Sequence, residues 1–345
     1  MIRSAGLLLL MLAATLSACG FVAMRPAAAP LPAANVAPAE ATALPLKSGQ
    51  IRINGGGAPK LADVPLMMAI DKLKAQGYSV QTVELARFDL APTALVKGDL
   101  DIASASYESL WSAIAKGAKL RTVAGWLGNP YVVVTKAGIV TCAGLNNKNV
   151  AYGSTASMNA IMLGLYLDRT CPGNEPRIAV IPSSANRVSA LLAGQIDAAV
   201  LEIIDALYIE RQAPGQFHVL IRLCDEFPGV ANGGYTVQTD FASEHPEILR
   251  DFIAALLQAH RQVQDKQALA TAIGMYLDND ARSLAAMDAY LALNAWDVNG
   301  GLTEERVQRT LDFLTESKLL PAGLTVDQVS DLAYLNEVLA QIGKK

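Results

Sequence analysis

Two short segments place hydroxyl side chains at points where a strand is expected to give way to a helix. Hydroxyl groups and backbone N–H groups at a helix start attract negative charge, because the helix dipole is positive there. We therefore predict that these segments contact an anionic group of a small solute, and Tyr107 also offers a stacking face; the alternative is that the hydroxyls only cap the helices. The candidate residues are Ser104, Ser106, Tyr107, Gly153, Ser154, Thr155 and Ser157.

A third candidate segment is glycine-rich and follows the first strand-like run of the chain. Gly56 and Gly57 let backbone N–H groups approach an anion at a helix start, and Lys60 ends the segment. The spacing is not the Gly-x-Gly-x-x-Gly of a dinucleotide-binding loop, because Lys60 stands in place of the last glycine. The segment is predicted to contact the solute; the alternative is a tight turn.

A carboxylate and three further side chains complete the candidate set. Glu202 ends a strand-like run, and a carboxylate that faces the solute would favour an amine or an amidine-like ring. The alternative for Glu202 is a solvated edge or a helix cap. Trp126, Asn232 and Tyr235 lie beside the segments where the chain is expected to cross between lobes, so ligand contact and hinge packing are equally good interpretations.

The sequence gives little support for catalytic or metal chemistry. His218, His245 and His260 are far apart and lack metal-ligand spacing. The chain has no Gly-x-Ser-x-Gly elbow and no Gly-x-x-x-x-Gly-Lys-Ser/Thr loop. A formal net charge of −4 without a run of Lys or Arg argues against nucleic acid. We therefore expect a binding protein with no enzymatic activity, no cofactor and no metal.

The N-terminal residues indicate secretion and membrane anchoring. An apolar run at 7–14 follows Arg3 and has the length of a signal-peptide core. Residues 16–19 read Leu-Ser-Ala-Cys, which resembles the lipobox of bacterial lipoproteins and implies that Cys19 is lipidated; the alternative is an ordinary signal peptide with a chance cysteine. We predict a signal peptide at 1–18 and an Ala/Pro-rich tether at 19–48, which holds the protein on the periplasmic side of the cell envelope.

From residue 50 onward, β-rich and helical runs alternate, which is typical of α/β domains with a parallel sheet. The same order of strands, glycine loops and helices occurs twice. Residues 98–103 read Gly-Asp-Leu-Asp-Ile-Ala and residues 194–199 read Gly-Gln-Ile-Asp-Ala-Ala, so two similarly built lobes are the simplest interpretation. The expected strands of the two copies are 51–54, 79–85, 100–105, 149–152, 177–182 and 196–201.

Two further strand-like runs, 131–136 and 234–239, stand where the chain would cross between the lobes. After Asp240 the sequence is almost wholly helical, and these helices are expected to pack against the first lobe, to which the chain has returned. Their predicted ranges are 244–266, 269–277, 283–295, 303–317 and 326–342.

The segments 51–73, 97–103, 193–199 and 241–246 resemble, in this order, the periplasmic binding proteins for nitrate, sulfonates, taurine and thiamine precursors. The resemblance implies the type II periplasmic-binding-protein fold: an α/β structure with two lobes, two crossing hinge strands, a ligand cleft and a helical C-terminal region. It also implies an ABC permease and an ATPase as partners. The first lobe is predicted at 49–131, the hinge strands and second lobe at 132–236, and the return to the first lobe at 237–345.

The expected ligand is a small organic anion or zwitterion of the sulfonate, taurine or nitrate kind, captured for import by a monomer. Two alternatives stay open. A heteroaromatic like a thiamine-pyrimidine precursor would be held by Tyr107 or Trp126, with Glu202 pairing a ring amine. A sensory lipoprotein would use the same cleft to pass a signal instead.

The cysteines after Cys19 are Cys142, Cys171 and Cys224. In an oxidising compartment Cys142 and Cys171 could pair, because they flank one expected strand–helix unit. Cys224 would then remain as a buried free thiol.

Overall fold

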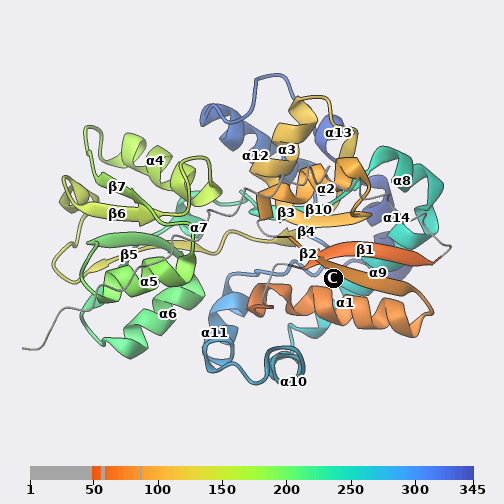
Figure 1. Cartoon of the computed structure of the whole chain (residues 1–345), viewed down its shortest axis with the longest axis horizontal. Coiled ribbons are helices and arrows are strands. Elements are labelled where there is room, and N and C mark those ends of the chain that lie inside the picture. The colour runs from red at the N-terminus through yellow and green to blue at the C-terminus, as the bar shows by residue number, and fades with distance from the viewer. Residues whose placement is uncertain (1–48, 56–58, 86–87) are drawn as a thin grey trace, which may run out of the picture. The chain divides into compact units, whose positions relative to one another are not determined.

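The first sheet is built from strands that precede the second sheet in the chain and from one strand that follows it. The computed structural model describes residues 49–55, 59–85 and 88–345 (Figure 1). Among these residues the strands form two sheets. The strand order of the first sheet is β2 (Ser79–Glu84), β1 (Gln50–Gly55), β3 (Ile102–Ser106), β10 (Gly233–Gln238) and β4 (Leu120–Leu127).

The second sheet is built from the middle of the chain, and α4 covers one face while α5 and α6 cover the other (Figure 1). We call each sheet with its helices a lobe. The strand order of the second sheet is β7 (Arg177–Val180), β6 (Asn149–Tyr152), β8 (Ala198–Glu202), β5 (Tyr131–Lys136) and β9 (Phe217–Arg222).

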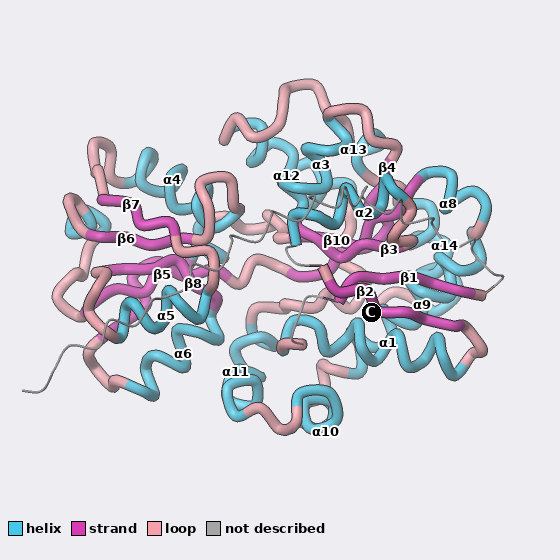
Figure 2. Tube along the Cα trace, viewed as in Figure 1, coloured by secondary structure: helices cyan, strands magenta, loops and turns pink. Residues whose placement is uncertain are grey.

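Helices connect most of the strands, and those that follow β10 gather around the first sheet (Figure 2). The short 3₁₀ helices are η1 (Leu61–Asp63), η2 (Phe88–Leu90) and η3 (Cys142–Leu145). The helices up to β10 are α1 (Val64–Ala75), α2 (Ala91–Lys97), α3 (Tyr107–Ala115), α4 (Met158–Thr170), α5 (Ser184–Leu192), α6 (Ile203–Gln212) and α7 (Leu223–Glu226). The later helices are α8 (Thr239–Glu244), α9 (Pro246–Gln262), α10 (Lys266–Leu277), α11 (Ala281–Ala292), α12 (Glu304–Glu316), α13 (Val326–Val329) and α14 (Ala333–Ile342).

The alternating pattern of the sequence predicts parallel sheets. Both sheets are instead mixed, because each contains one strand that runs antiparallel to its neighbours. In the first sheet β1 is parallel to β2 and β3, but β10 is antiparallel to β3 and β4. In the second sheet β6 is parallel to β7 and β8, but β5 is antiparallel to β8 and β9. The reversed strands, β5 and β10, are the first strands after each crossing. Each enters its sheet from the edge nearest the other lobe and therefore runs against its neighbours.

The chain crosses between the sheets in residues 128–130 and 223–232. The expected runs 131–136 and 234–239 match β5 and β10, which follow the crossings and belong to the second and first sheets respectively. The expected lobe boundary after residue 236 falls inside β10. Strands β4 and β9, which flank the crossings on their other sides, had no counterpart in the sequence analysis.

The repeated Gly-x-x-Asp signature has the same structural role in both lobes. Gly98 and Gly194 each follow a helix with φ of +73°, the left-handed conformation that glycine adopts without strain. Asp101 Oδ2 accepts the backbone N–H of Arg52 in β1 at 2.6 Å, and Asp197 Oδ2 accepts the N–H of Asn149, the first residue of β6, at 3.0 Å. The aspartate of each copy therefore ties β1 to β3 in the first lobe and β6 to β8 in the second.

Two of the expected C-terminal helices are interrupted. The run 244–266 breaks at His245 because Pro246 begins α9, and the residue before a proline is pushed out of the helical conformation. The run 326–342 breaks at Ser330, which forms a β-bridge with Thr122 of β4. In addition, α11 does not pack only on the first lobe, since it also contacts α6 of the second.

We predict that Asp101→Ala destabilises the protein far more than Asp197→Ala. Asp101 forms a buried ion pair with Arg52 at 2.7 Å, and its removal leaves a buried guanidinium, at a cost of about 3–5 kcal/mol. Asp197 pairs with Lys136 where both side chains are partly exposed, so its loss should cost about 1 kcal/mol. Urea unfolding of both variants measures the difference, and equal losses would contradict the assignment.

Candidate functional site

The edges of the two sheets that adjoin the crossings face one another. At the first sheet Gly233 is in register with both Ser106 and Leu127. At the second sheet Tyr131 is in register with Glu202. Only residues 128–130 separate β4 from β5, so the edges there are at most about 14 Å apart. Because β3 and β8 end at these edges, this is where open α/β sheets bind ligands.

Two buried asparagines fasten the crossings together. Asn129 Nδ2 donates to the carbonyl oxygen of Leu223 at 3.0 Å, and its Oδ1 accepts the Tyr131 N–H at 3.1 Å. Asn232 Oδ1 accepts the Tyr131 hydroxyl at 3.1 Å, and its carbonyl oxygen accepts the Tyr107 N–H. Of the two roles considered for Asn232, these contacts are those of hinge packing.

In the second lobe, the hydroxyl-rich segment forms the loop between β6 and α4. Ser154 and Thr155 are exposed. Ser157 Oγ lies 2.7 Å from the carbonyl oxygen of Ser154 and accepts the Ser154 N–H at 3.3 Å. A Cβ at Gly153 would lie 3.5 Å from Arg187 Nη1, so the loop packs closely on that guanidinium. The loop is therefore ordered by its own serine, with two hydroxyl side chains left at its surface.

In the first lobe, Ser104 lies in the interior of the sheet. Its backbone N–H and carbonyl group both pair with the side-chain amide of Asn54, at 2.7 Å each, which joins the ends of β1 and β3. Ser106 is partly buried at the end of β3, with its hydroxyl 3.4 Å from that of Ser109. Gly56 and Gly57 lie outside the described residues.

The predicted aromatic contacts are mostly core side chains. Tyr107 is 1% exposed and its ring stacks on Trp111 with centroids 4.4 Å apart. Tyr235 is also 1% exposed and packs edge-on against Phe252. Trp126 is 7% exposed, at the end of β4 beside the first crossing. The structure thus places the rings of Tyr107 and Tyr235 in the packing of the first lobe.

Acidic groups of both lobes act on Lys60, which is exposed. The Glu202 carboxylate raises the pKa of Lys60 above its ordinary value. Burial raises the pKa of Asp63 to about 6, although Lys60 acts to lower it. Asp63 is the N-cap residue of α1, but its Oδ2 accepts the Lys60 N–H at 3.3 Å and makes no capping hydrogen bond to that helix. The electrostatic environment of Lys60 is thus set by acidic groups of both lobes.

Helix α11 of the C-terminal region contacts two acidic residues of the second lobe, Glu202 and Asp205. The Tyr290 hydroxyl donates to Glu202 Oε2 at 3.2 Å. Arg282 forms an ion pair with Asp205 at 2.5 Å, and its guanidinium lies over the Tyr208 ring, 4.3 Å from the centroid. The end of β8 and the first turn of α6 are therefore joined to α11 by a hydrogen bond and an ion pair.

Arg187 supplies a buried positive charge behind the second-lobe loops. It is 5% exposed and donates from Nε to Val200 O at 3.1 Å and from Nη1 to Ile181 O and Pro182 O at 2.7 and 3.0 Å. Burial lowers the pKa of Arg187, and the carboxylate of Asp205 opposes that shift. The guanidinium thus holds the ends of β7 and β8 in place while facing the acidic groups.

Glu108 lies in the first turn of α3, and its Oε2 atom is buried without a hydrogen-bond partner among the described residues. Burial raises the pKa of the Glu108 carboxyl to about 7, opposed by the Ser106 hydroxyl and by the backbone N–H groups of Glu108 and Met158. Met158 is the first residue of α4, so groups of both lobes influence this carboxyl.

The sequence analysis did not identify Glu108, Arg187, Arg282 or Tyr290 as site residues. An acidic residue in a first helical turn ordinarily complements the helix dipole, which is the signal that Glu108 gives. The other three lie within helices and reach the site only through the fold. A carboxylate directly after the hydroxyl-rich run 104–107 was the one available hint.

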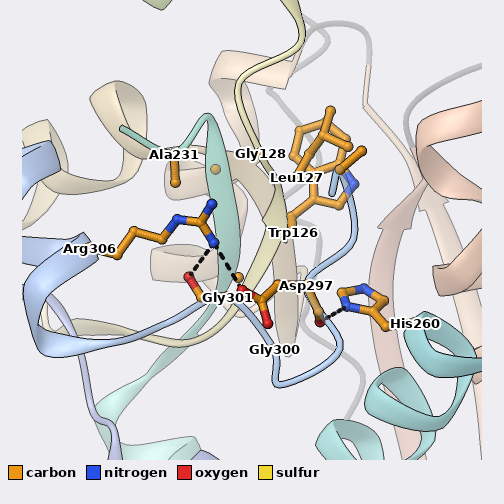
Figure 3. A pocket seen from close by; sticks show the side chains of 12 residues that line it. Trp126, Leu127, Gly128, Ala231, His260, Asp297, Gly300, Gly301 and Arg306 are labelled. Atoms are coloured by element: carbon orange, nitrogen blue, oxygen red, sulfur yellow. Dashed lines mark hydrogen bonds and ion pairs between the residues drawn. The ribbon is translucent and has the colours of Figure 1, made fainter. Parts of the chain in front are cut away.

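A small cavity lies beside the first crossing and is structural. Figure 3 shows Arg306 Nη1 directed at Asp297 Oδ2, 3.3 Å away, and at the Gly301 carbonyl oxygen. His260 Nδ1 lies 2.9 Å from Asp297 O, and burial lowers the pKa of His260 to about 4. The cavity holds about 10 Å³, room for one water and no solute. A larger groove of about 540 Å³ between α1, α9 and α10 contains none of the predicted site residues.

Cys142 and Cys171 are joined by a disulfide whose Cα atoms lie 6.3 Å apart, linking η3 to the end of α4. Cys224, in α7, is partly exposed. The prediction of a buried thiol there is wrong, because α7 is a single turn that leaves its outer face open to solvent. The prediction for Cys19 lies outside the described residues.

Within the described ranges, no group of His, Cys, Asp and Glu side chains is arranged to hold a metal ion. In the same ranges, no helix combines the length and apolar character needed to cross a membrane.

We predict that Glu108→Gln stabilises the protein at pH 8 relative to its effect at pH 4.5. An acid whose pKa is raised by folding costs no stability at a pH below the pKa that it has in the unfolded chain. Stability then falls progressively as the pH rises from that pKa through the pKa in the folded protein. With a folded pKa of about 7, the gain from removing the ionisable group should be on the order of 2 kcal/mol at pH 8. Unfolding of both proteins across this pH range measures it. A constant difference between them would show that Glu108 ionises normally.

Comparisons with known proteins agree with this geometry. Residues 64–270 match the family model described as NMT1/THI5 like. No curated protein matches the chain in sequence. A ligand-binding component of an ABC-type import system from Staphylococcus aureus is 16% identical, with a TM-score of 0.69 over 84% of this chain and 98% of that one.

Two further solved structures have the same fold. The alkanesulfonate-binding protein from Xanthomonas axonopodis pv. citri, bound to MOPS, is 20% identical, with a TM-score of 0.63 over 82% of this chain and 99% of its own. The periplasmic nitrate-binding protein from Synechocystis PCC 6803 is 14% identical, with a TM-score of 0.66 over 86% and 89%. The chain therefore belongs to the NMT1/THI5-like family and has the two-lobed fold of periplasmic binding proteins.

Proposed function

We propose that this protein is an extracytoplasmic solute-binding protein that delivers a small polar solute to an ABC importer. One observation carries the proposal: the edges of two sheets adjoin across two short crossings, and Glu202 and Asp205 of the second lobe are contacted there by Tyr290 and Arg282 of α11. A solute at this position would touch both lobes. Family and fold are those of binding proteins rather than of enzymes.

The solute class follows from the relatives and from the site together. The relatives named above bind alkanesulfonate and nitrate, which are small anions. Ser154 and Thr155 offer exposed hydroxyls beside the start of α4, where the helix dipole favours negative charge. A small organic anion or zwitterion is the solute we propose, with an amine-bearing heteroaromatic as the alternative that Glu202 favours.

The mechanism we propose is hinge closure. Residues 128–130 and 223–232 are short links fastened by Asn129 and Asn232, so the lobes can rotate about them without unfolding. A solute that contacts both lobes binds more tightly to the closed form, in which the lobes have moved toward each other, and it shifts the population toward that form. That form would then dock on a permease driven by an ATPase.

The location we propose rests on the sequence alone. Lipidated Cys19 would anchor the protein on the periplasmic side of the envelope, and the tether 19–48 would let it move over the surface. In the native host, Cys19→Ala should shift the protein from the detergent-rich fraction to the aqueous fraction on Triton X-114 partition. An unchanged distribution would remove the anchor.

Thermal unfolding with a panel of solutes tests the proposed function. Nitrate, alkanesulfonates, aminosulfonates and aminopyrimidines form the panel, and a binding solute at 100 times its Kd should stabilise the protein by about 2.7 kcal/mol. Glu202→Gln should weaken that solute about tenfold or more, because it removes the charge at the junction of the lobes.

Glu175→Gln is the matched control, since Glu175 is exposed at the opposite end of the second sheet, before β7, and the change should leave binding intact. The proposed function fails if no member of the panel shifts the midpoint. The site fails if both variants bind as the unmodified protein does.

A further inference from the structure

Helix α11 is fastened to the first lobe at its C-terminal end. Trp296, beyond the end of α11, donates from Nε1 to the carbonyl oxygen of Ala62 in η1 at 3.2 Å. The Tyr290 ring of α11 lies 5.3 Å from the Trp296 ring, centroid to centroid, and both side chains are buried. Lys266 of α10, a helix that packs on α1, forms an ion pair with Asp288 of α11 at 2.7 Å. Helix α11 therefore moves with the first lobe.

The first turn of α11 reaches the second lobe, where Arg282 pairs with a buried carboxylate. Asp205 Oδ1 lies 2.5 Å from Arg282 Nη2, and the Asp205 side chain is buried. The other oxygen of Asp205, Oδ2, accepts the hydroxyl of Ser184 in α5. The Arg282 guanidinium also covers the ring of Tyr208, one turn further along α6. Asp205 thus has one donor from its own lobe and one from the first lobe, and the second donor is lost whenever α11 and α6 separate.

A turn in the left-handed conformation directs this end of α11. Asp278 and Asn279, between α10 and α11, have φ of +49° and +55°, which residues other than glycine rarely adopt. Two such residues in succession persist only where the surrounding structure fixes them. Asp280 then caps α11, since its Oδ2 accepts the Ser283 N–H at 2.8 Å. The direction of the first turn is therefore fixed, and with it the position of Arg282 facing α6.

Helix α12, by contrast, contacts the second lobe at a crossing. Thr310 of α12 accepts the Ala231 N–H at 3.2 Å. Arg169 of α4 pairs with Glu316 of α12 at 2.5 Å and lies over the ring of Phe227 in the same crossing. Contacts gathered at a crossing lie close to the axis of a rotation about it, so they change little when the lobes rotate. The contact between α11 and α6 includes no residue of the crossings, so it can open.

We propose that α11 is a latch between the lobes, and that the ion pair of Arg282 and Asp205 forms when the lobes close and breaks when they open. The pair stabilises the closed form alone, because it exists only there. Its strength then sets the fraction of the protein that is closed before any solute binds. Since the solute prefers the closed form, its apparent affinity rises with that fraction. The inference rests on the hinge closure proposed above and adds to it a control that works in the absence of solute.

Distance measurements on the full chain without solute test the latch. Azide-bearing amino acids at Gln267 of α10 and Arg211 of α6, both exposed positions, carry spin labels, and pulsed electron paramagnetic resonance measures the distance between the lobes. Arg282→Ala should move the distribution toward longer distances. Arg250→Ala is the matched control, because Arg250 pairs with Glu337 inside the first lobe at 2.6 Å and its loss should leave the distribution in place.

Arg282→Lys retains the positive charge but not the planar group that covers Tyr208, so it should give a distribution between those of the unmodified protein and Arg282→Ala. The apparent affinity for a binding solute should fall about threefold or more in Arg282→Ala, in step with the closed fraction. An unchanged distribution in both Arg282 variants would overturn the latch, as would an equal change in Arg250→Ala. Failure of every solute to bind would remove the proposed function, whereas the distances alone decide the latch.

Discussion

The structure depends on one constraint: the chain leaves the first sheet, builds the second, and returns through links that are too short to let the sheets separate. The first strand after each crossing runs against its neighbours, and this reversal places the start of β5 beside the end of β8 and the start of β10 beside the end of β3. The buried side chains of Asn129 and Asn232 join the two crossing segments to each other through hydrogen bonds.

The electrostatics of the junction follow from that constraint. Charges brought together at the edges lose water, so each must find a partner from the other lobe. Arg282 pairs with Asp205 at 2.5 Å, the Tyr290 hydroxyl donates to Glu202, and the Glu202 carboxylate raises the pKa of Lys60. Glu108 Oε2, in the first turn of α3, is buried without a hydrogen-bond partner among the described residues.

Much of the fold could be predicted from the sequence because its signals are local. The strands expected at 131–136 and 149–152 match β5 and β6, and the two copies of the repeated segment lead into β3 and β8. Strands β4 and β9 were missed. The break at Ser330 depends on a bridge to Thr122, more than 200 residues earlier in the chain, which no local pattern shows.

The candidate site was predicted less well, for a physical reason. Position in the chain indicated which loops end at the facing edges, and Glu202 and the loop 153–157 lie there. Burial could not be inferred, so Tyr107 and Tyr235 were proposed as contacts although both are core side chains. Partners supplied by distant helices, such as Tyr290 of α11, depend on tertiary packing and left no trace in the sequence near the site.

Hydrogen–deuterium exchange with and without saturating 2-aminoethanesulfonate tests the central claim most directly. If a solute bridges the facing edges, exchange should slow in both lobes together, at the start of α3 around residues 106–110 and at the loop and first turn of α4 around residues 153–160. Slowing confined to one lobe, or to the outer groove between α1, α9 and α10, would contradict the account.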